Sequence, residues 1–210
     1  MNRINNNTPI YRQELKYKIM RTAMPLFKQK GIKAVRMDDI AAKLSISKRT
    51  LYEIYETKED LLLECVRLDA DELSKKILDY TMTAENELDI VITYFRFKFA
   101  DLDSLSAVFL SELNRYTSVL EYLRQQHEEQ QKKSIEFIRR CIENGFFVPD
   151  LDYTIIQKLC EEIMESGIIA KLTPQHTLKE IFYNFFIVLL RGFCTERGLI
   201  LLDNYIKKKF

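Results

Sequence analysis

Six neighbouring polar side chains could together bind a nucleic acid. Of Ser47, Lys48, Arg49, Thr50, Tyr52 and Glu53, two are cations and three carry hydroxyl groups. Such groups bind phosphates, and an arginine can also pair with the O6 and N7 atoms of guanine. Small and apolar residues recur around them with helical spacing, at Ile40, Ala41, Leu44, Ile46, Leu51 and Tyr55. This pattern predicts two short crossed helices, residues 37–44 and 48–55, with the polar set facing outward as in a helix-turn-helix.

The segment from Gly31 to Leu62 resembles the N-terminal signature of the TetR/AcrR family of repressors. The matching residues are Phe27, Gly31, Asp39-Ile40-Ala41, Leu44, Ile46-Ser47, Thr50-Leu51-Tyr52, Tyr55 and Thr57-Lys58-Glu59-Asp60-Leu61-Leu62. They cover about a quarter of the chain. The resemblance implies backbone contacts to DNA from Thr50, Tyr52 and Lys58, and base contacts from Lys48 or Arg49. With the first motif helix included, the expected DNA-binding residues are Arg36, Met37, Ser47, Lys48, Arg49, Thr50, Tyr52 and Lys58.

Four positions depart from the family pattern. Ser45 stands where a turn glycine is usual, so a non-glycine residue must adopt an unusual backbone angle. Val35-Arg36 replaces the usual threonine pair, which removes the ordinary N-cap and leaves Arg36 free to reach a phosphate. Pro25 lies inside the preceding helix, where it should remove a hydrogen bond and kink the helix.

Helical periodicity continues through the rest of the sequence. It predicts helices over residues 11–30, 58–80, 117–144, 153–170, 174–195 and 199–208, with two more near residues 88–99 and 105–113. Glycine and proline are scarce, and no alternating strand pattern is present. We therefore expect an all-α chain of about nine to ten helices. Residues 1–57 should form a three-helix DNA-binding domain, with 1–10 disordered, and 58–210 a helical-bundle domain for ligand binding and dimerisation.

Charge is distributed unevenly along the chain. Residues 1–60 contain 13 Lys or Arg and 7 Asp or Glu, a net charge of +6, whereas the remainder carries −5. A basic head on a mildly acidic body suits contact with a polyanion, although chance clustering on a solvated surface gives the same numbers.

The two long C-terminal helices are apolar around more than one face, which predicts burial on two sides. Either they fill a core within the chain, or they form the four-helix dimer interface that the resemblance implies. We expect the dimer interface to contain Ile155, Ile156, Leu159, Ile163, Gly167, Leu178, Phe182, Phe185, Leu189 and Gly192.

The chain has thirteen Phe and eleven Tyr residues, enough to line an aromatic pocket. Aromatic residues at helical spacing more often belong to an ordinary hydrophobic core. The resemblance implies a small, hydrophobic effector among the central helices. The candidate ligand-binding residues are Tyr94, Phe95, Phe99, Phe109, Tyr116, Leu123, His127, Phe137, Cys141, Met164 and Tyr183.

Enzymatic chemistry is disfavoured. The chain has two histidines and no Gly-rich phosphate loop, and we expect no cofactor and no metal. Its four cysteines lie far apart, as expected of reduced, buried thiols in a cytoplasmic protein. The apolar stretch 181–193 is too short to span a membrane.

The sequence therefore predicts a homodimeric repressor that binds a palindromic operator and is released by a small molecule. Two alternatives remain open: a ligand-independent DNA-binding protein acting as a spatial or architectural factor, and, more remotely, an enzyme or transporter accessory that uses an aromatic cavity. DNA binding separates the last from the other two, and release by a small molecule separates the first two.

Overall fold

The computed structural model describes residues 9–100 and 102–209, with side chains except at positions 103, 164, 165, 170 and 209. Within these ranges the chain is helical, and its β-type pairing is one isolated bridge between Phe147 and Cys194. The predicted all-α fold is confirmed. The chain divides into two compact units. The first holds residues 9–72 and 104–124, and the second holds residues 73–103 and 125–209.

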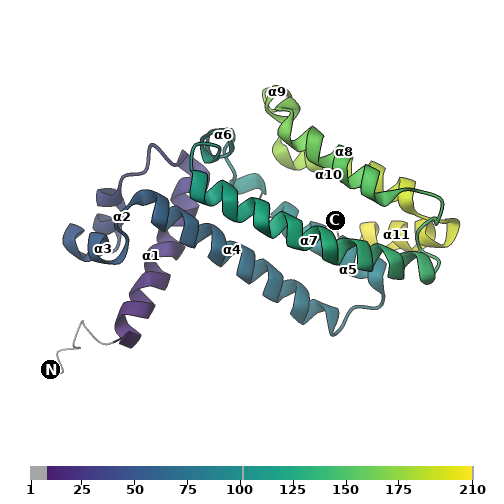
Figure 1. Cartoon of the computed structure of the whole chain (residues 1–210), viewed down its shortest axis with the longest axis horizontal. Coiled ribbons are helices and arrows are strands. Elements are labelled where there is room, and N and C mark those ends of the chain that lie inside the picture. Colours follow the sequence, from purple (N-terminus) through teal and green to yellow (C-terminus); the bar gives the residue numbers. More distant parts are fainter. Residues whose placement is uncertain (1–8, 101, 210) are drawn as a thin grey trace. The chain divides into compact units, whose positions relative to one another are not determined.

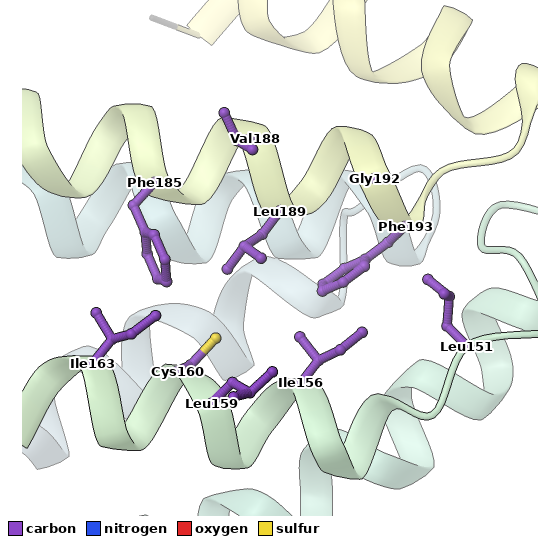
Figure 2. Close-up of a pocket in the computed structure, with 10 residues that line it drawn as sticks. All are labelled: Leu151, Ile156, Leu159, Cys160, Ile163, Phe185, Val188, Leu189, Gly192 and Phe193. Carbon is purple, nitrogen blue, oxygen red and sulfur yellow. The ribbon is translucent and has the colours of Figure 1, made fainter.

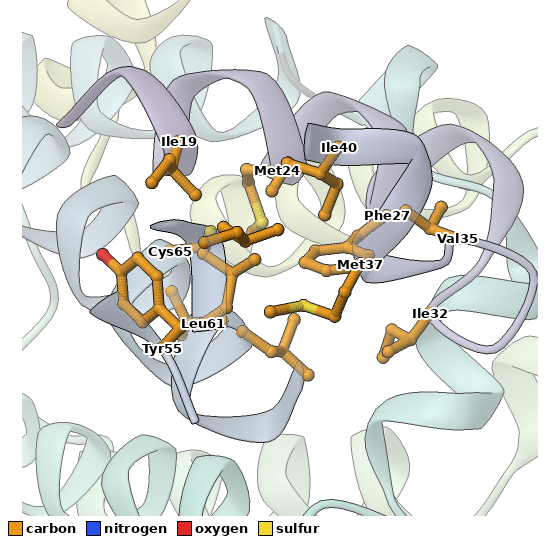
Figure 3. Close-up of a cluster of buried hydrophobic side chains, with 14 of the residues drawn as sticks. Ile19, Met24, Phe27, Ile32, Val35, Met37, Ile40, Tyr55, Leu61 and Cys65 are labelled. Atoms are coloured by element: carbon orange, nitrogen blue, oxygen red, sulfur yellow. The ribbon is translucent and has the colours of Figure 1, made fainter. Parts of the chain in front are cut away.

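The first unit is built around the predicted helix-turn-helix (Figure 1). Its helices are α1 (Pro9–Lys30), α2 (Met37–Lys43), α3 (Lys48–Ile54), the beginning of α4 (Lys58–Thr81), α6 (Ala107–Leu113) and the beginning of α7 (Thr117–Glu143). Its core gathers side chains from all six, among them Phe27, Ile40, Leu51, Leu61 and Phe109. Figure 3 shows part of this core, including Phe27, Ile40 and Leu61. The two motif helices are thus held by a core that α6 and α7 help to complete.

The second unit holds the remaining parts of α4 and α7 together with the C-terminal helices. These are α5 (Glu87–Ala100), α8 (Tyr153–Glu165), α9 (Ile168–Leu172), α10 (Leu178–Phe193) and α11 (Glu196–Lys209), and a 3-10 turn η1 (Leu102–Ser104) follows α5. Helix α5 packs against α11 and α10. The core of this unit is rich in aromatic residues, and Phe95 and Phe186 stack with ring centroids 3.5 Å apart.

Most of the predicted boundaries hold, and several move. Helix α1 begins at Pro9, earlier than expected, since proline is well tolerated in a first helical turn; residues 1–8 of the expected disordered arm lie outside the described residues. Helix α1 continues through the exposed Pro25. The helix predicted over 153–170 is two helices, because Gly167 has a left-handed φ of 71° and ends the first. Helix α10 begins only at Leu178, where Thr177 and Glu180 form a capping box.

Gly31 and Ser45 have left-handed φ angles, as the sequence analysis predicted for Ser45. Gly31 follows α1 with φ of 84°, and Ser45 occupies the turn between α2 and α3 with φ of 54°. Gly31 is also confined by packing, since a Cβ there would lie 2.7 Å from Cγ1 of Val108. The positive φ is the stronger reason for glycine at this junction, because the exposed Val108 side chain can rotate away from an added Cβ.

Candidate nucleic-acid interface and apolar groove

The turn between α2 and α3 is fixed by hydrogen bonds and burial. The amide of Ile46 donates to the carbonyl of Ala41 at 3.0 Å, and Ala41 is buried where the two helices meet. Ser47 caps α3, because its Oγ accepts the amide of Thr50 at 3.0 Å. The same Oγ lies 2.7 Å from Oγ1 of Thr50. This geometry orients the first turn of α3 so that Lys48 and Arg49 lie on its exposed side.

The polar residues of α3 form an exposed surface. The side chains of Lys48 and Arg49 are 67% and 88% exposed, and Tyr52 is exposed as well. Each cation has an acidic partner, and the sequence analysis anticipated neither pairing. Lys48 pairs with Asp38 of α2, and Nε of Arg49 donates to Oε1 of Glu53 at 2.8 Å. That hydrogen bond raises the pKa of Arg49, which stays fully charged. The four-residue spacing of Arg49 and Glu53 was the signal available in the sequence.

Arg36 and Met37, the two residues predicted to contact DNA at the start of α2, have different environments. Arg36 is exposed, and its amide donates to Oδ2 of Asp39 at 3.1 Å, which is the bond that the third helical residue makes in a capping box. Met37 is 6% exposed and packs in the core (Figure 3). The expectation that the Met37 side chain contacts DNA is therefore wrong: its position on α2 faces the core.

Lys58 forms hydrogen bonds within its own chain. Its ammonium donates to the carbonyl oxygens of Ile32 at 2.8 Å and Val35 at 3.0 Å, and lies 3.4 Å from that of Lys33. Partial burial lowers the pKa of this ammonium group. Lys58 thus fastens the loop between α1 and α2 to the start of α4, and a phosphate contact from it stays a prediction.

Helices α8 and α10 border an apolar groove of about 350 Å³ (Figure 2). Ile156, Cys160 and Ile163 of α8 point toward Phe185 and Leu189 of α10. The groove is also lined by Leu151, Leu159, Val188, Gly192 and Phe193. Exposed apolar side chains surround it: Leu159 is 57% exposed and Val188 70%. A surface of this kind is typical of an interaction site.

The residues predicted for a dimer interface mostly lie at this groove. Ile156, Leu159, Ile163, Phe185, Leu189 and Gly192 line it, and Ile155 is exposed beside it on α8. Leu178 is buried within the subunit, so its side chain is not available to a partner. Phe182 packs against the aromatic core of the second unit, and Gly167 serves the turn that ends α8.

The segment that carries the helix-turn-helix also matches a known family. Residues 19–65 match the family described as bacterial regulatory proteins, tetR family. Over this segment the chain is similar to the transcriptional regulators of the TetR family. Curated relatives include the HTH-type transcriptional repressor KstR2 of Mycobacterium tuberculosis, which is 25% identical over 149 residues, 69% of this chain and 74% of the relative. KstR2 of Mycolicibacterium smegmatis is 22% identical over 161 residues, 74% of this chain and 78% of the relative.

Solved structures of TetR-family proteins share the fold. A regulator from Agrobacterium tumefaciens has a TM-score of 0.68 at 16% identity, covering 88% of this chain and all of that one. KstR2 of M. tuberculosis, described as a ketosteroid transcriptional regulator, has a TM-score of 0.59 at 21% identity, covering 92% of this chain and all of that one.

The candidate ligand-binding residues do not gather at one place. Phe109, Tyr116 and Leu123 belong to the core of the first unit. Five others pack in the core of the second unit: Phe95, Phe99, Phe137, Cys141 and Tyr183. Tyr94 meets Phe95 edge to face, with ring centroids 5.1 Å apart. His127 is exposed and lies 2.8 Å from Oε1 of Glu161. The side chain of Met164 lies outside the described residues.

A larger and more polar hollow lies elsewhere in the second unit. It has a volume of about 900 Å³, and of the predicted ligand-binding residues it includes only Phe137. Its wall is formed by Ile77, Thr81, Ala84, Glu85, Asn86, Glu87, Ile90, Phe137, Arg140, Glu143, Asn144, Phe146 and Arg197. Two of these side chains, Ile77 and Thr81, come from the last turns of α4. Within the described residues we find no cluster of acidic, histidine or cysteine side chains that could hold a metal, and no helix able to cross a membrane.

Proposed function

We propose that this protein is a homodimeric repressor that binds a palindromic operator and is released from it by a small hydrophobic molecule. The observation that carries the proposal is α3: a capped helix, presenting exposed Lys48 and Arg49, within the segment that matches the TetR family. An exposed cation pair at the start of a recognition helix suits both phosphates and base edges in a major groove. Arg36, Ser47, Thr50 and Tyr52 complete the proposed contact surface.

A second copy of the chain is the proposed occupant of the groove between α8 and α10. Pairing by a two-fold axis would cover Leu159 and Val188 of both subunits with each other's apolar side chains. Burial of about 25 cal/mol per Å² of apolar surface is the driving force for such an association. Two-fold symmetry presents two α3 helices to DNA, which is the reason for a palindromic operator with half-sites roughly 34–36 Å apart or further.

We further propose that the effector binds in the larger hollow of the second unit, with its apolar part against Ile77, Ile90, Phe137 and Phe146. The volume of the hollow, about 900 Å³, lies within the range typical of small-molecule sites. Helix α4 begins with Lys58, beside the loop that precedes α2, and its last turns supply Ile77 and Thr81 to the hollow. A ligand that displaced these turns would act directly on a helix shared with the DNA-binding unit.

Two further expectations belong to the same proposal. The functional division of the chain falls at residues 57 and 58, with DNA contacts before it and effector binding and pairing after it, and the protein acts in the cytoplasm with the chromosome. The curated relatives are named repressors, which supports a repressor rather than an architectural factor.

A direct test uses the DNA immediately upstream of the protein's own reading frame. We expect a labelled duplex of this region to bind as a complex with two subunits, with an affinity that falls steeply with salt. Arg49→Ala should cost about 1–3 kcal/mol of binding free energy and relax base preference. If the wild-type protein bound this duplex and a scrambled duplex equally at every salt concentration, the operator proposal would be rejected.

A further inference from the structure

The cations of the recognition helix are each held by an acid. Lys48 pairs with Asp38 from α2, and Arg49 pairs with Glu53 one turn later on α3. All four side chains are exposed, at 67%, 44%, 88% and 58% respectively. These four groups add no net charge to a surface that must meet a polyanion. Exposed pairs contribute little to folding, so their place on this surface calls for another explanation.

The Arg49–Glu53 pair leaves the end of the guanidinium free. Nε of Arg49 donates to Oε1 of Glu53 at 2.8 Å, and its two Nη groups have no hydrogen-bond partner among the described residues. The bond at Nε limits rotation of the planar group, while both Nη groups remain available. Guanine presents O6 and N7 at the spacing that such a fork contacts. Arg49 can therefore contact guanine without giving up Glu53.

Contact with a phosphate, unlike contact with guanine, requires these cations to give up their acidic partners. A phosphate that approaches Arg49 or Lys48 from the side of the ion pair must displace a carboxylate and then remain beside it. Repulsion between the carboxylate and neighbouring phosphates weakens binding to any sequence, because backbone contacts provide most of the non-specific affinity. A repulsive element that penalises the wrong complex more than the right one increases specificity.

We propose that Glu53 and Asp38 are specificity determinants of this surface: Glu53 positions Arg49 for guanine, and both acids suppress contact with the DNA backbone. The inference rests on the proposed DNA-binding function. Glu53 acts through Arg49 and is a positioning residue.

The test compares Glu53→Ala, Glu53→Gln and Asp38→Asn with the wild type. Glutamine keeps an oxygen acceptor for Nε of Arg49 but removes the charge, whereas alanine removes both. Glu136→Gln is the matched control, because Glu136 pairs with Arg139 on an exposed face of α7 in the second unit, so the same charge is lost away from α3. The two duplexes are a random-sequence duplex and an operator that the wild-type protein selects from a random library.

All three variants should bind the random duplex about three- to tenfold more tightly at 0.1 M salt, with a salt slope steeper by up to about 0.9 for each phosphate gained. The control should match the wild type. In the selected operator, replacing the contacted guanine by 7-deazaguanine removes N7. This should weaken wild-type binding about tenfold, but leave Arg49→Ala and Glu53→Ala almost unaffected. Glu53→Gln should remain sensitive to the loss of N7, because its oxygen still positions Arg49.

Two results would overturn the inference: a Glu53→Ala variant that keeps both the wild-type sensitivity to 7-deazaguanine and the wild-type affinity for random DNA, or a control that shifts as much as the other variants. A wild-type protein that selects no duplex would instead overturn the proposed function, so the two failures are distinguishable. Circular dichroism of each variant confirms that the helices persist.

Discussion

The charge of Lys58 is directed at the backbone of its own chain. Its ammonium contacts three carbonyl oxygens in the loop between α1 and α2, at 2.8 Å from Ile32, 3.0 Å from Val35 and 3.4 Å from Lys33. Because these carbonyls belong to no helix, Lys58 supplies hydrogen bonds that the loop otherwise lacks. The loop leads directly into α2, so this single side chain helps to set the position of the helix-turn-helix.

Lys58→Ala should lower the free energy of unfolding by about 1–3 kcal/mol, since hydrogen bonds from a charged donor are lost and carbonyls are left unsatisfied. Urea unfolding monitored by circular dichroism measures the change. Lys75→Ala is the control, because Lys75 is exposed on the same helix, and it should stay within about 0.5 kcal/mol of the wild type. An unchanged unfolding midpoint for Lys58→Ala would contradict a structural role. A salt slope of DNA binding that flattens by about one unit would identify an additional phosphate contact.

The contacts of Lys58 could not be predicted from the sequence pattern. Sequence pattern identified Lys48 and Arg49 as exposed cations because the apolar residues around them define a face of α3. The pattern did not show that Lys58 and Met37, unlike Lys48 and Arg49, contact other parts of the same chain. Whether Lys58 meets a phosphate or a carbonyl depends on the path of a loop more than twenty residues earlier, and Met37 is turned inward by the packing of α2 on α1.

At the scale of single helices, the start of α11 is controlled by one close approach. A Cβ on Gly198 would lie 2.3 Å from the carbonyl oxygen of Phe146 and 3.2 Å from Cβ of Cys194. Thr195 caps this helix, and its Oγ1 accepts the amide of Gly198 at 3.1 Å. The segment before α8 and the first turn of α11 are therefore in direct backbone contact.

Gly198→Ala should destabilise the protein by about 1–3 kcal/mol, because the methyl group can be placed only by moving backbone. Thermal unfolding measures the loss. Ser74→Ala offers a comparison: Ser74 is exposed within α4 and away from the groove, so helix propensity predicts no loss and a gain of at most about 0.5 kcal/mol. Equal melting temperatures for the two variants would refute the packing argument.

The helix-turn-helix could be predicted closely because its determinants are local. A capping serine, a small crossing residue and a short apolar repeat all lie within twenty residues of one another. The longer C-terminal helices were predicted less well. Apolar periodicity continues across Gly167, so it does not reveal that the chain turns there with a left-handed φ. The capping box of Thr177 and Glu180 was visible in the sequence and would have placed the start of α10 correctly.

Periodicity also identifies a buried face without identifying what it is buried against. Most of the predicted ligand-binding residues are partly or fully buried, as expected of aromatic side chains, but Phe109 lies in one core and Phe99 in another. The assignment of such residues to a common site needs contacts between distant segments, which spacing along a helix does not provide.

At the scale of the whole molecule, assembly is the first property to test. Leu159→Glu and Val188→Glu should each convert the proposed dimer to monomers, because a carboxylate would be buried in an apolar interface. Sedimentation equilibrium measures the change. Leu78→Glu is the control, since Leu78 is 66% exposed on α4, away from the groove. Dimers that persist in both groove variants would show that the subunits pair elsewhere.

Buried thiols make stability depend on pH at the alkaline end. Burial raises the pKa of Cys141 to about 12 and that of Cys194 to about 11. Their neutral form is favoured in the folded state, whereas the unfolded thiols ionise near pH 8.5. Stability from these groups is therefore fully present below about pH 8.5 and is lost as the pH rises toward the folded values.

We expect the urea midpoint to fall between pH 8.5 and 10, and the fall to be smaller in Cys141→Ala, which lacks one of these thiols. A Cys160→Ala variant is the comparison, because Cys160 is only half-buried and lines the groove. A midpoint that stays constant over this range in the wild type would be incompatible with thiols kept neutral by burial.

The DNA-binding unit is discontinuous in the sequence, and this affects how the protein is made. Phe109 and Val119 belong to the same core as the helix-turn-helix, yet they follow it by more than fifty residues. At about 5–20 residues per second, a ribosome needs several seconds to deliver them after α3 has been translated. During that interval the nascent motif holds an incomplete core, with Phe27 and Leu61 short of partners. We therefore expect a nascent chain stalled before residue 104 to be far more sensitive to protease in α1–α3 than one stalled after residue 124 has left the exit tunnel.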